Sequence, residues 1–474
     1  MIRPLRFARS AALGAGLVGV GLASASVLHA QAKPARPAAS TERRCQLQIV
    51  NVDRQGVRTE PTKGVENLFA GGNVHVVCRG QNIHIYADSV ASYGGSVVQF
   101  ISLGRRVRYR DSTTTLDADF GTYFKDGERF EAQGNVVHKD LKNGSSITGP
   151  RVDYYRPIKN VRNDLQVLGY NRPTIVYAVK DSLGKPAEPY TIVGNQVKIV
   201  GSDVIFAGGA VTFKRSDLDG KSDSLWLDSG KLERGQMLGH ASLGGGKADS
   251  FNLTAKDIDI RLRQRELAGL KAKANAKLVS KDVNLDADSI QIEMVDRQAE
   301  RTRAWGKTVR PEAVSGDYRI RGDSLLIETP GQRLERVQAF GSAWAGLKPD
   351  SAAQRRDWIS GEKVIALFVD RDSAGVKKTA ISELQAENQA RSFYQMAPER
   401  PNQPGSINYT RASRIVVKMR VTADSNTVES VSAEGAVDGV HLQPALKADS
   451  TKVDSTRRAN PPRALPARPP GGDR

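Results

Sequence analysis

An aspartate that begins a short apolar stretch recurs along this chain at a nearly constant interval. Successive positions are separated by 31, 34, 70, 34, 31 and 35 residues, and the gap of 70 is two periods. They are Asp88, Asp119, Asp153, Asp223, Asp257, Asp288 and Asp323. A fixed period in this range is typical of stacked architectures, in which one repeat cannot bury its apolar face without its neighbours. The repeat therefore predicts a stack of similar units that share a core.

The apolar residues within these units alternate with polar ones, as in β-strands with one buried face. The alternation is clear in 258–262 (Ile-Asp-Ile-Arg-Leu), and a glycine-rich turn such as 71–73 (Gly-Gly-Asn) separates such runs. We therefore expect an all-β fold in which each aspartate makes turn hydrogen bonds rather than binding calcium. One stretch, 381–395, is rich in Gln, Glu and Ala and fits a helix or a strand.

The N-terminus has the pattern of an export signal. Arg3, Arg6 and Arg9 precede an apolar run, and the triplet at 30–32 (Ala-Gln-Ala) is of the kind that signal peptidases cleave. A cleaved signal peptide over residues 1–32 is predicted, and an uncleaved anchor is the alternative. Cleavage after export would place the protein in the periplasm.

The rest of the chain divides by composition. The expected segments are a linker at 33–44, a first β-module at 45–177, a proline-bearing linker at 178–189, a diverged second module at 190–444 and a basic tail at 445–474. The tail has several prolines and almost no apolar residues, so it is predicted to be disordered.

The net charge limits the classes of possible binding partner, and the cysteines indicate the redox environment. The formal net charge is +18, which attracts anions such as nucleic acid, acidic polysaccharide or lipid phosphates. Export makes nucleic acid the poorest of these partners. The two cysteines, Cys45 and Cys78, are predicted to form a disulfide in an oxidising compartment, with a contribution of roughly 3 to 4 kcal/mol.

Four phrases carry a family resemblance. They are 72–74 (Gly-Asn-Val), 85–90 (Ile-Tyr-Ala-Asp-Ser-Val), 116–123 (Leu-Asp-Ala-Asp-Phe-Gly-Thr-Tyr) and 132–136 (Ala-Gln-Gly-Asn-Val). In this order and spacing they resemble the periplasmic lipopolysaccharide-transport family of OstA-like, or LptA-type, proteins. The resemblance is good over residues 65–156 and looser over 192–440. This chain is about twice as long as a typical bridge protein of that family.

The resemblance implies a β-jelly-roll, or "taco", built of stacked ~33-residue strand pairs, here in two consecutive modules. It implies a periplasmic component that carries the lipid A acyl chains of lipopolysaccharide, or of a related anionic glycolipid, in an apolar groove during outer-membrane assembly. It also implies edge-strand pairing with other β-jelly-roll proteins of the transport system.

Two sets of residues are candidates for contacting such a lipid. The apolar, groove-facing candidates are Val74, Val76, Ile83, Ile85, Val107, Tyr109, Leu116, Ala118, Phe120 and Val136. The basic candidates for a phosphate-binding rim are Arg106, Arg108 and Arg110, for which a solvated strand face is the alternative.

No catalytic signature accompanies these patterns. The chain has no G-x-S-x-G elbow, P-loop or dinucleotide fingerprint, so we expect no enzyme activity and no cofactor. His75, His84 and Cys78 form a local group that is too weak a pattern to predict a metal site. An exported β-solenoid that binds or degrades polysaccharide remains the alternative function.

Overall fold

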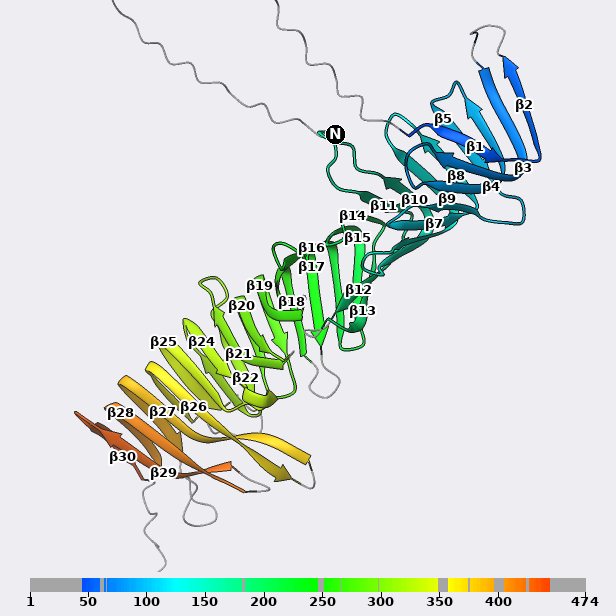
Figure 1. The fold of residues 1–474 in the computed structure, drawn as a ribbon. Coiled ribbons are helices and arrows are strands. Elements are labelled where there is room, and N and C mark those ends of the chain that lie inside the picture. The colour runs from blue at the N-terminus through cyan, green and yellow to red at the C-terminus, as the bar shows by residue number, and fades with distance from the viewer. Residues whose placement is uncertain are drawn as a thin grey trace, which may run out of the picture. The chain divides into compact units, whose positions relative to one another are not determined.

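The computed structural model describes residues 45–59, 64, 66–180, 184–245, 251–264, 266–296, 298–347, 357–373, 376–395, 405–422 and 426–443. This part of the chain is all-β apart from one 3-10 turn, η1, at Pro330–Gln332 (Figure 1). The expected signal peptide at 1–32, the linker at 33–44 and the tail at 445–474 lie outside the described residues.

The strands of the first half of the chain are β1 (Leu47–Asn51), β2 (Arg54–Thr59), β3 (Glu66–Cys78), β4 (His84–Tyr93), β5 (Val97–Ile101), β6 (Val107–Arg110), β7 (Thr114–Ala118), β8 (Phe120–Phe124), β9 (Arg129–Asp140), β10 (Ser146–Tyr155), β11 (Gln166–Tyr170), β12 (Thr174–Lys180), β13 (Pro186–Val193), β14 (Gln196–Val200) and β15 (Val204–Arg215).

Those of the second half are β16 (Leu218–Asp228), β17 (Arg234–Gly245), β18 (Phe251–Arg263), β19 (Glu266–Val279), β20 (Asn284–Val295), β21 (Gln298–Trp305), β22 (Glu312–Ser315), β23 (Tyr318–Arg321), β24 (Ser324–Glu328), β25 (Arg336–Leu347), β26 (Trp358–Ser373), β27 (Val376–Gln395), β28 (Ile407–Val421), β29 (Asn426–Glu434) and β30 (Asp438–Leu442).

All of these strands belong to one antiparallel ladder, in which each layer has two halves joined at a corner. Short strands show the division: β4 pairs with β6 through residues 84–86 and with β5 through residues 89–93. Half A contains β1, β6, β7, β12, β13, β22, β23 and β30. Half B contains β2, β5, β8, β11, β14, β21, β24 and β29. Long strands such as β9 and β17 cross from one half to the other.

The corners of several long strands consist of two consecutive residues with left-handed backbone. In β9 these are Gly134 (φ 76°) and Asn135 (φ 45°), and the pairing of β9 with β10 shifts register there. Glycine is required first, because a Cβ at Gly134 would lie 2.4 Å from Oδ2 of Asp119 in the preceding layer. The extra residue bends the strand and keeps apolar side chains on the inner face in both halves.

Aspartates occupy the corners of the neighbouring layers and accept hydrogen bonds there. Oδ2 of Asp119 accepts from Nδ2 of Asn135 at 2.9 Å, and Oδ2 of Asp88 accepts from the Leu103 amide at 2.6 Å. Asp288 accepts three backbone N–H bonds, from residues 307 to 309, and these bonds lower the pKa of its carboxyl. Asp153 differs, because it is buried within β10 and pairs with Arg129 of the neighbouring β9 and with Arg151 of its own strand.

The two halves face each other across one contiguous apolar core that extends from Cys45 to Met419. The contents of this core change along the chain. Its most deeply buried aromatic rings come from residues 100–177 and include Tyr109, Tyr123, Tyr154 and Tyr177. Later layers bury aliphatic side chains, both large ones such as Ile258 and Ile290 and small ones, among them Ala272, Ala287, Ala313, Ala339, Ala366 and Ala386.

Two features of the sequence analysis can be placed in the structure. The stretch 381–395, which fits a helix or a strand by composition, is part of β27. Pairing continues across the expected linker at 178–189, where Val179 lies opposite Ala187 in the β12–β13 pair. The described residues, which begin at Cys45, form one compact unit. Within the described ranges, no helix has the length and apolar character needed to cross a membrane.

The corner geometry predicts that Gly134→Ala destabilises the fold by roughly 1 to 3 kcal/mol, because alanine is strained at positive φ and its Cβ would meet Asp119. Gly127→Ala is the control, since a Cβ there has its nearest neighbour at 3.8 Å. Urea unfolding of both variants measures the difference. Equal stability of the two would show that the corner does not need glycine.

Candidate functional site

Most of the predicted groove residues form packed core. Val74, Val76, Ile83, Ile85, Val107, Tyr109, Leu116, Ala118 and Val136 are all buried. Phe120 is 52% exposed and lies on the outer face, because the corner at Asp119 moves the inward positions from 116 and 118 to 121 and 123. Aromatic rings from the two halves meet here, with centroids of Tyr109 and Phe130 5.2 Å apart.

Little space remains in this N-terminal part of the interior. The cavity found there, lined by His138, Ile147 and Tyr177 among others, has a volume of about 10 Å³. Burial lowers the pKa of His138 to about 4, so its imidazole is neutral at neutral pH. The apolar interior around this cavity is therefore too tightly filled to admit a ligand in this conformation.

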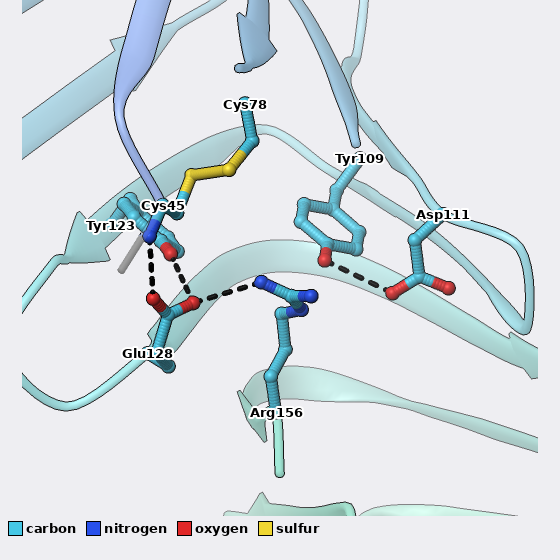
Figure 2. Close-up of a disulfide and its surroundings, with 7 residues drawn as sticks. All are labelled: Cys45, Cys78, Tyr109, Asp111, Tyr123, Glu128 and Arg156. Atoms are coloured by element: carbon cyan, nitrogen blue, oxygen red, sulfur yellow. Dashed lines mark hydrogen bonds and ion pairs between the residues drawn. A yellow bond between two sulfur atoms is a disulfide. The ribbon is translucent and has the colours of Figure 1, made fainter. Parts of the chain in front are cut away.

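A buried carboxylate, Glu128, connects the two halves at their free ends, which we call the mouth. It lies in the β8–β9 turn of half B (Figure 2). Its carboxylate accepts hydrogen bonds from the Cys45 amide (2.9 Å), the Tyr123 hydroxyl (2.6 Å) and Nη1 of Arg156 (2.8 Å). Burial and this negative charge both raise the pKa of the Tyr123 hydroxyl, which keeps it a donor.

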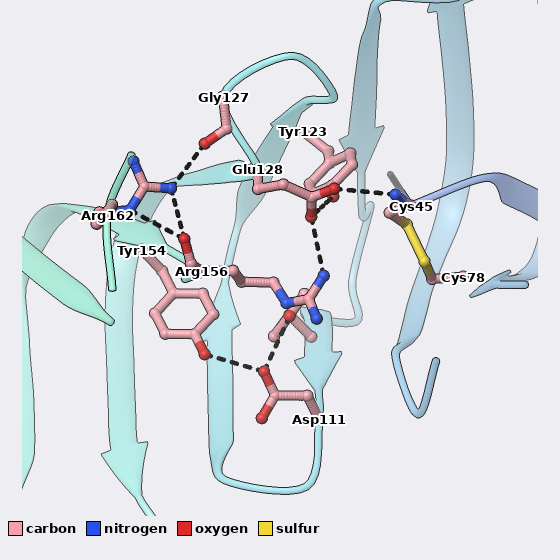
Figure 3. Close-up of polar contacts among 10 residues, drawn as sticks. Cys45, Cys78, Asp111, Tyr123, Gly127, Glu128, Tyr154, Arg156 and Arg162 are labelled. Carbon is pink, nitrogen blue, oxygen red and sulfur yellow. Dashed lines mark hydrogen bonds and ion pairs between the residues drawn. A yellow bond between two sulfur atoms is a disulfide. The ribbon is translucent and has the colours of Figure 1, made fainter. Parts of the chain in front are cut away.

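A second carboxylate, Asp111, makes a similar connection from half A (Figure 3). Its Oδ2 accepts from the hydroxyls of Tyr109 (3.0 Å) and Tyr154 (2.9 Å), which come from opposite halves. Together Glu128 and Asp111 hold the mouth closed over the aromatic core. Such a network is stabilising only while each buried polar group keeps its partner.

The predicted disulfide between Cys45 and Cys78 is confirmed, with the two Cα atoms 5.3 Å apart. It joins the residues just before β1 to the end of β3 (Figure 2). Because the Cys45 amide also donates to Glu128, this bond ties the first layer to the closed mouth.

The network predicts that Arg156→Met destabilises the protein by about 3 kcal/mol, because the buried carboxylate of Glu128 loses its cation. The double variant Arg156→Met/Glu128→Gln should recover part of the loss, since no uncompensated charge remains. Chemical denaturation of the singles and the double gives the coupling free energy. Additive effects would contradict a direct interaction.

Farther along the chain the mouth contains an apolar cleft, the 251–334 cleft, with a volume of about 110 Å³. Its lining comes from both halves. The apolar lining residues are Phe251, Leu278, Val283, Ile292, Ala299, Ile327 and Leu334. Ser280, Lys281, Asp282, Thr329 and Gln332 add polar groups. A smaller cavity of about 80 Å³, which includes Ile359, Leu384 and Met419 in its lining, follows in later layers.

The 251–334 cleft was missed at the level of sequence. Its lining residues come from strands β18, β19, β20, β21 and β24 and from the turns after β19 and β24, so no local pattern in the sequence marks it. An apolar cavity with polar groups at one side suits a ligand that has a hydrocarbon part and a polar part.

The predicted phosphate rim lies elsewhere. Val107 and Tyr109 point inward, so Arg106, Arg108 and Arg110 lie on the outer face of half A. Arg110 pairs with Asp117 at 2.7 Å, as a solvated strand face would allow. None of the three lines the 251–334 cleft.

A larger depression of about 940 Å³ opens near the C-terminal part of half B. Its basic side chains are matched by acids: Arg301 lies 3.5 Å from Glu293, and Arg336 lies 3.2 Å from Glu328. Because the arginines of this depression already pair with acidic side chains, we assign no charged ligand to it.

The chain matches no protein-family model and no curated protein. Among the described residues, no group of three or more His, Cys, Asp or Glu side chains is placed to hold a metal ion.

Proposed function

We propose that the protein is a periplasmic lipid carrier that binds acyl chains of lipopolysaccharide, or of a related anionic glycolipid, in the 251–334 cleft. The observation that carries this proposal is the contrast within one interior. The N-terminal layers contain the most deeply buried aromatic rings and are tied together at the mouth, whereas the layers around residues 251–334 leave an apolar opening between the halves.

The proposed fold is an OstA-like β-jelly-roll. Bent antiparallel layers with an apolar inner face support it, as do the Gly-Asn corners at 72–73 and 134–135 within the phrases that resemble the family. Aspartate corners alternate with left-handed corners, so two layers span about the interval between aspartates. The export pattern at 1–32 is consistent with a periplasmic location.

Lipid binding would widen the cleft. Ligand pockets ordinarily measure roughly 300 to 1,000 Å³, more than the 110 Å³ present here. Each methylene that enters would contribute ~0.8 kcal/mol, which opposes the cost of separating the halves.

The cleft predicts that Ala299→Trp reduces lipid A binding at least tenfold, because Ala299 is a half-buried residue of the lining and an indole would fill the space. Gln298→Trp adds the same ring at the exposed neighbouring position and should bind like the parent. Native mass spectrometry of the mature proteins with added lipid A measures both. Binding that is absent in the parent, or equal in both variants, would count against the cleft.

The same preparation tests the alternative. A parent protein that refuses lipid A but retains acidic polysaccharide in a glycan-binding screen would support the exported polysaccharide-binding function instead.

We further propose that terminal strands pair with other β-jelly-roll chains. In the described part of the chain, β29 and β30 pair only with β28, and β1 and β2 pair only with β3. The outer edges of these strands carry backbone N–H and C=O groups with which a strand of another chain can pair. Val440 and Leu442 on β30 are more than half exposed.

Edge pairing predicts that the parent chain self-associates as concentration rises, and that Val440→Asp/Leu442→Asp shifts it toward monomer, because charge on an edge strand opposes pairing. Val161→Asp, at an exposed position in the loop after β10, is the control. Sedimentation velocity reports the change. Association that all three chains share would exclude β30 as the contact.

A further inference from the structure

A cavity of about 360 Å³ lies at the corner of the first layers, among residues of β3, β4 and the β5–β6 connection. We call it the corner pocket. Three arginines line it: Arg105, Arg106 and Arg108. No ion pair joins any of them to a carboxylate within the described residues, although most outward-facing arginines discussed above have an acidic partner.

The three guanidinium groups are held by neutral groups. Nη2 of Arg106 donates to the backbone carbonyls of Asp117, at 2.9 Å, and Asn135. Nη1 of Arg105 donates to Oδ1 of Asn73 at 3.2 Å. These contacts orient the cations without cancelling their charge, which is the arrangement that an anion site requires.

An aromatic stack supports the third arginine. The Cζ atom of Arg108 lies 5.2 Å from the centre of the Tyr86 ring, and the His75 ring stacks on Tyr86 with centroids 4.3 Å apart. His75 Nε2 lies 3.1 Å from His84 Nδ1, so the imidazoles are linked. The stack fixes one wall of the pocket.

The pocket also contains one carboxylate, Asp88. Its Oδ2 accepts the Leu103 amide at 2.6 Å, which commits that oxygen to the corner. Three guanidinium groups therefore face one carboxylate that is already hydrogen-bonded, and the local charge is positive.

We propose that the corner pocket binds a phosphate ester through Arg105 and Arg108, with Arg106 completing the positive wall. Guanidinium groups match phosphate oxygens in charge and geometry. The volume accommodates the phosphate together with part of the group that it esterifies. The site lies outside the apolar interior, so it stands whether or not the 251–334 cleft binds lipid.

The chemistry is shared by lipid headgroups and by free phosphate compounds, so the test uses both. Inorganic phosphate is titrated into the full chain while the ring signals of His75 and His84 are followed by NMR. Flotation with phosphatidylcholine vesicles, with and without phosphatidic acid, measures capture by a headgroup. We expect shifts of both histidine rings, or selective flotation with the phosphatidic acid vesicles, or both.

Arg105→Gln/Arg108→Gln should weaken the response about tenfold or more, as expected for the loss of charge-assisted hydrogen bonds. Arg110→Gln is the matched control, because Arg110 lies on the same face of β6 but already pairs with Asp117. Arg108→Gln alone provides a second variant with less change of charge. All of the altered side chains are at least partly exposed, so folding should be kept.

Selective flotation without a response to inorganic phosphate assigns the site to a headgroup, and a response to both assigns it to the phosphate itself. Absence of both responses, or equal losses in Arg110→Gln and the double variant, would overturn the proposal.

Discussion

The bend in each layer is the constraint on which the rest of the structure depends. A flat β-sheet with this alternation would expose its apolar face, and the described residues include no α-helix that could cover it. Two left-handed residues at the corner, such as Gly134 and Asn135, turn the strand so that its two halves cover each other. The aspartate of the adjacent layer then occupies the space that the glycine leaves beside it. Local backbone geometry thus decides where the core is.

Much of the fold could be predicted from period and alternation. Period-two patterning indicates strands, and the recurring aspartates other than Asp153 mark corners, because both signals act over a few residues. Which residues of a strand face the core and which face outward was harder to predict. Phe120 was expected inside and lies outside, since a corner shifts the alternation by one residue and the sequence does not state where the shift falls.

The candidate site was less predictable than the fold. Groove residues were sought where the family phrases are clearest, yet those layers contain Tyr109, Tyr123 and Tyr154 and have almost no free volume. Whether an apolar face forms a groove or a packed core depends on the volumes of side chains that meet across the two halves. The total volume of these side chains depends on residues that are far apart in sequence. Repeat period and polar–apolar alternation are local signals and do not give it.

The ladder has a consequence for length. Pairing continues from β1 to β30 without a break, and each layer pairs only with the layers beside it. The local contacts of a middle layer are therefore the same whatever the number of layers. Inserting or deleting two layers would change how far the interior extends and leave both end strands intact. The number of layers therefore sets the distance between the two end strands, and it can change in steps of two layers without altering the residues of either pocket.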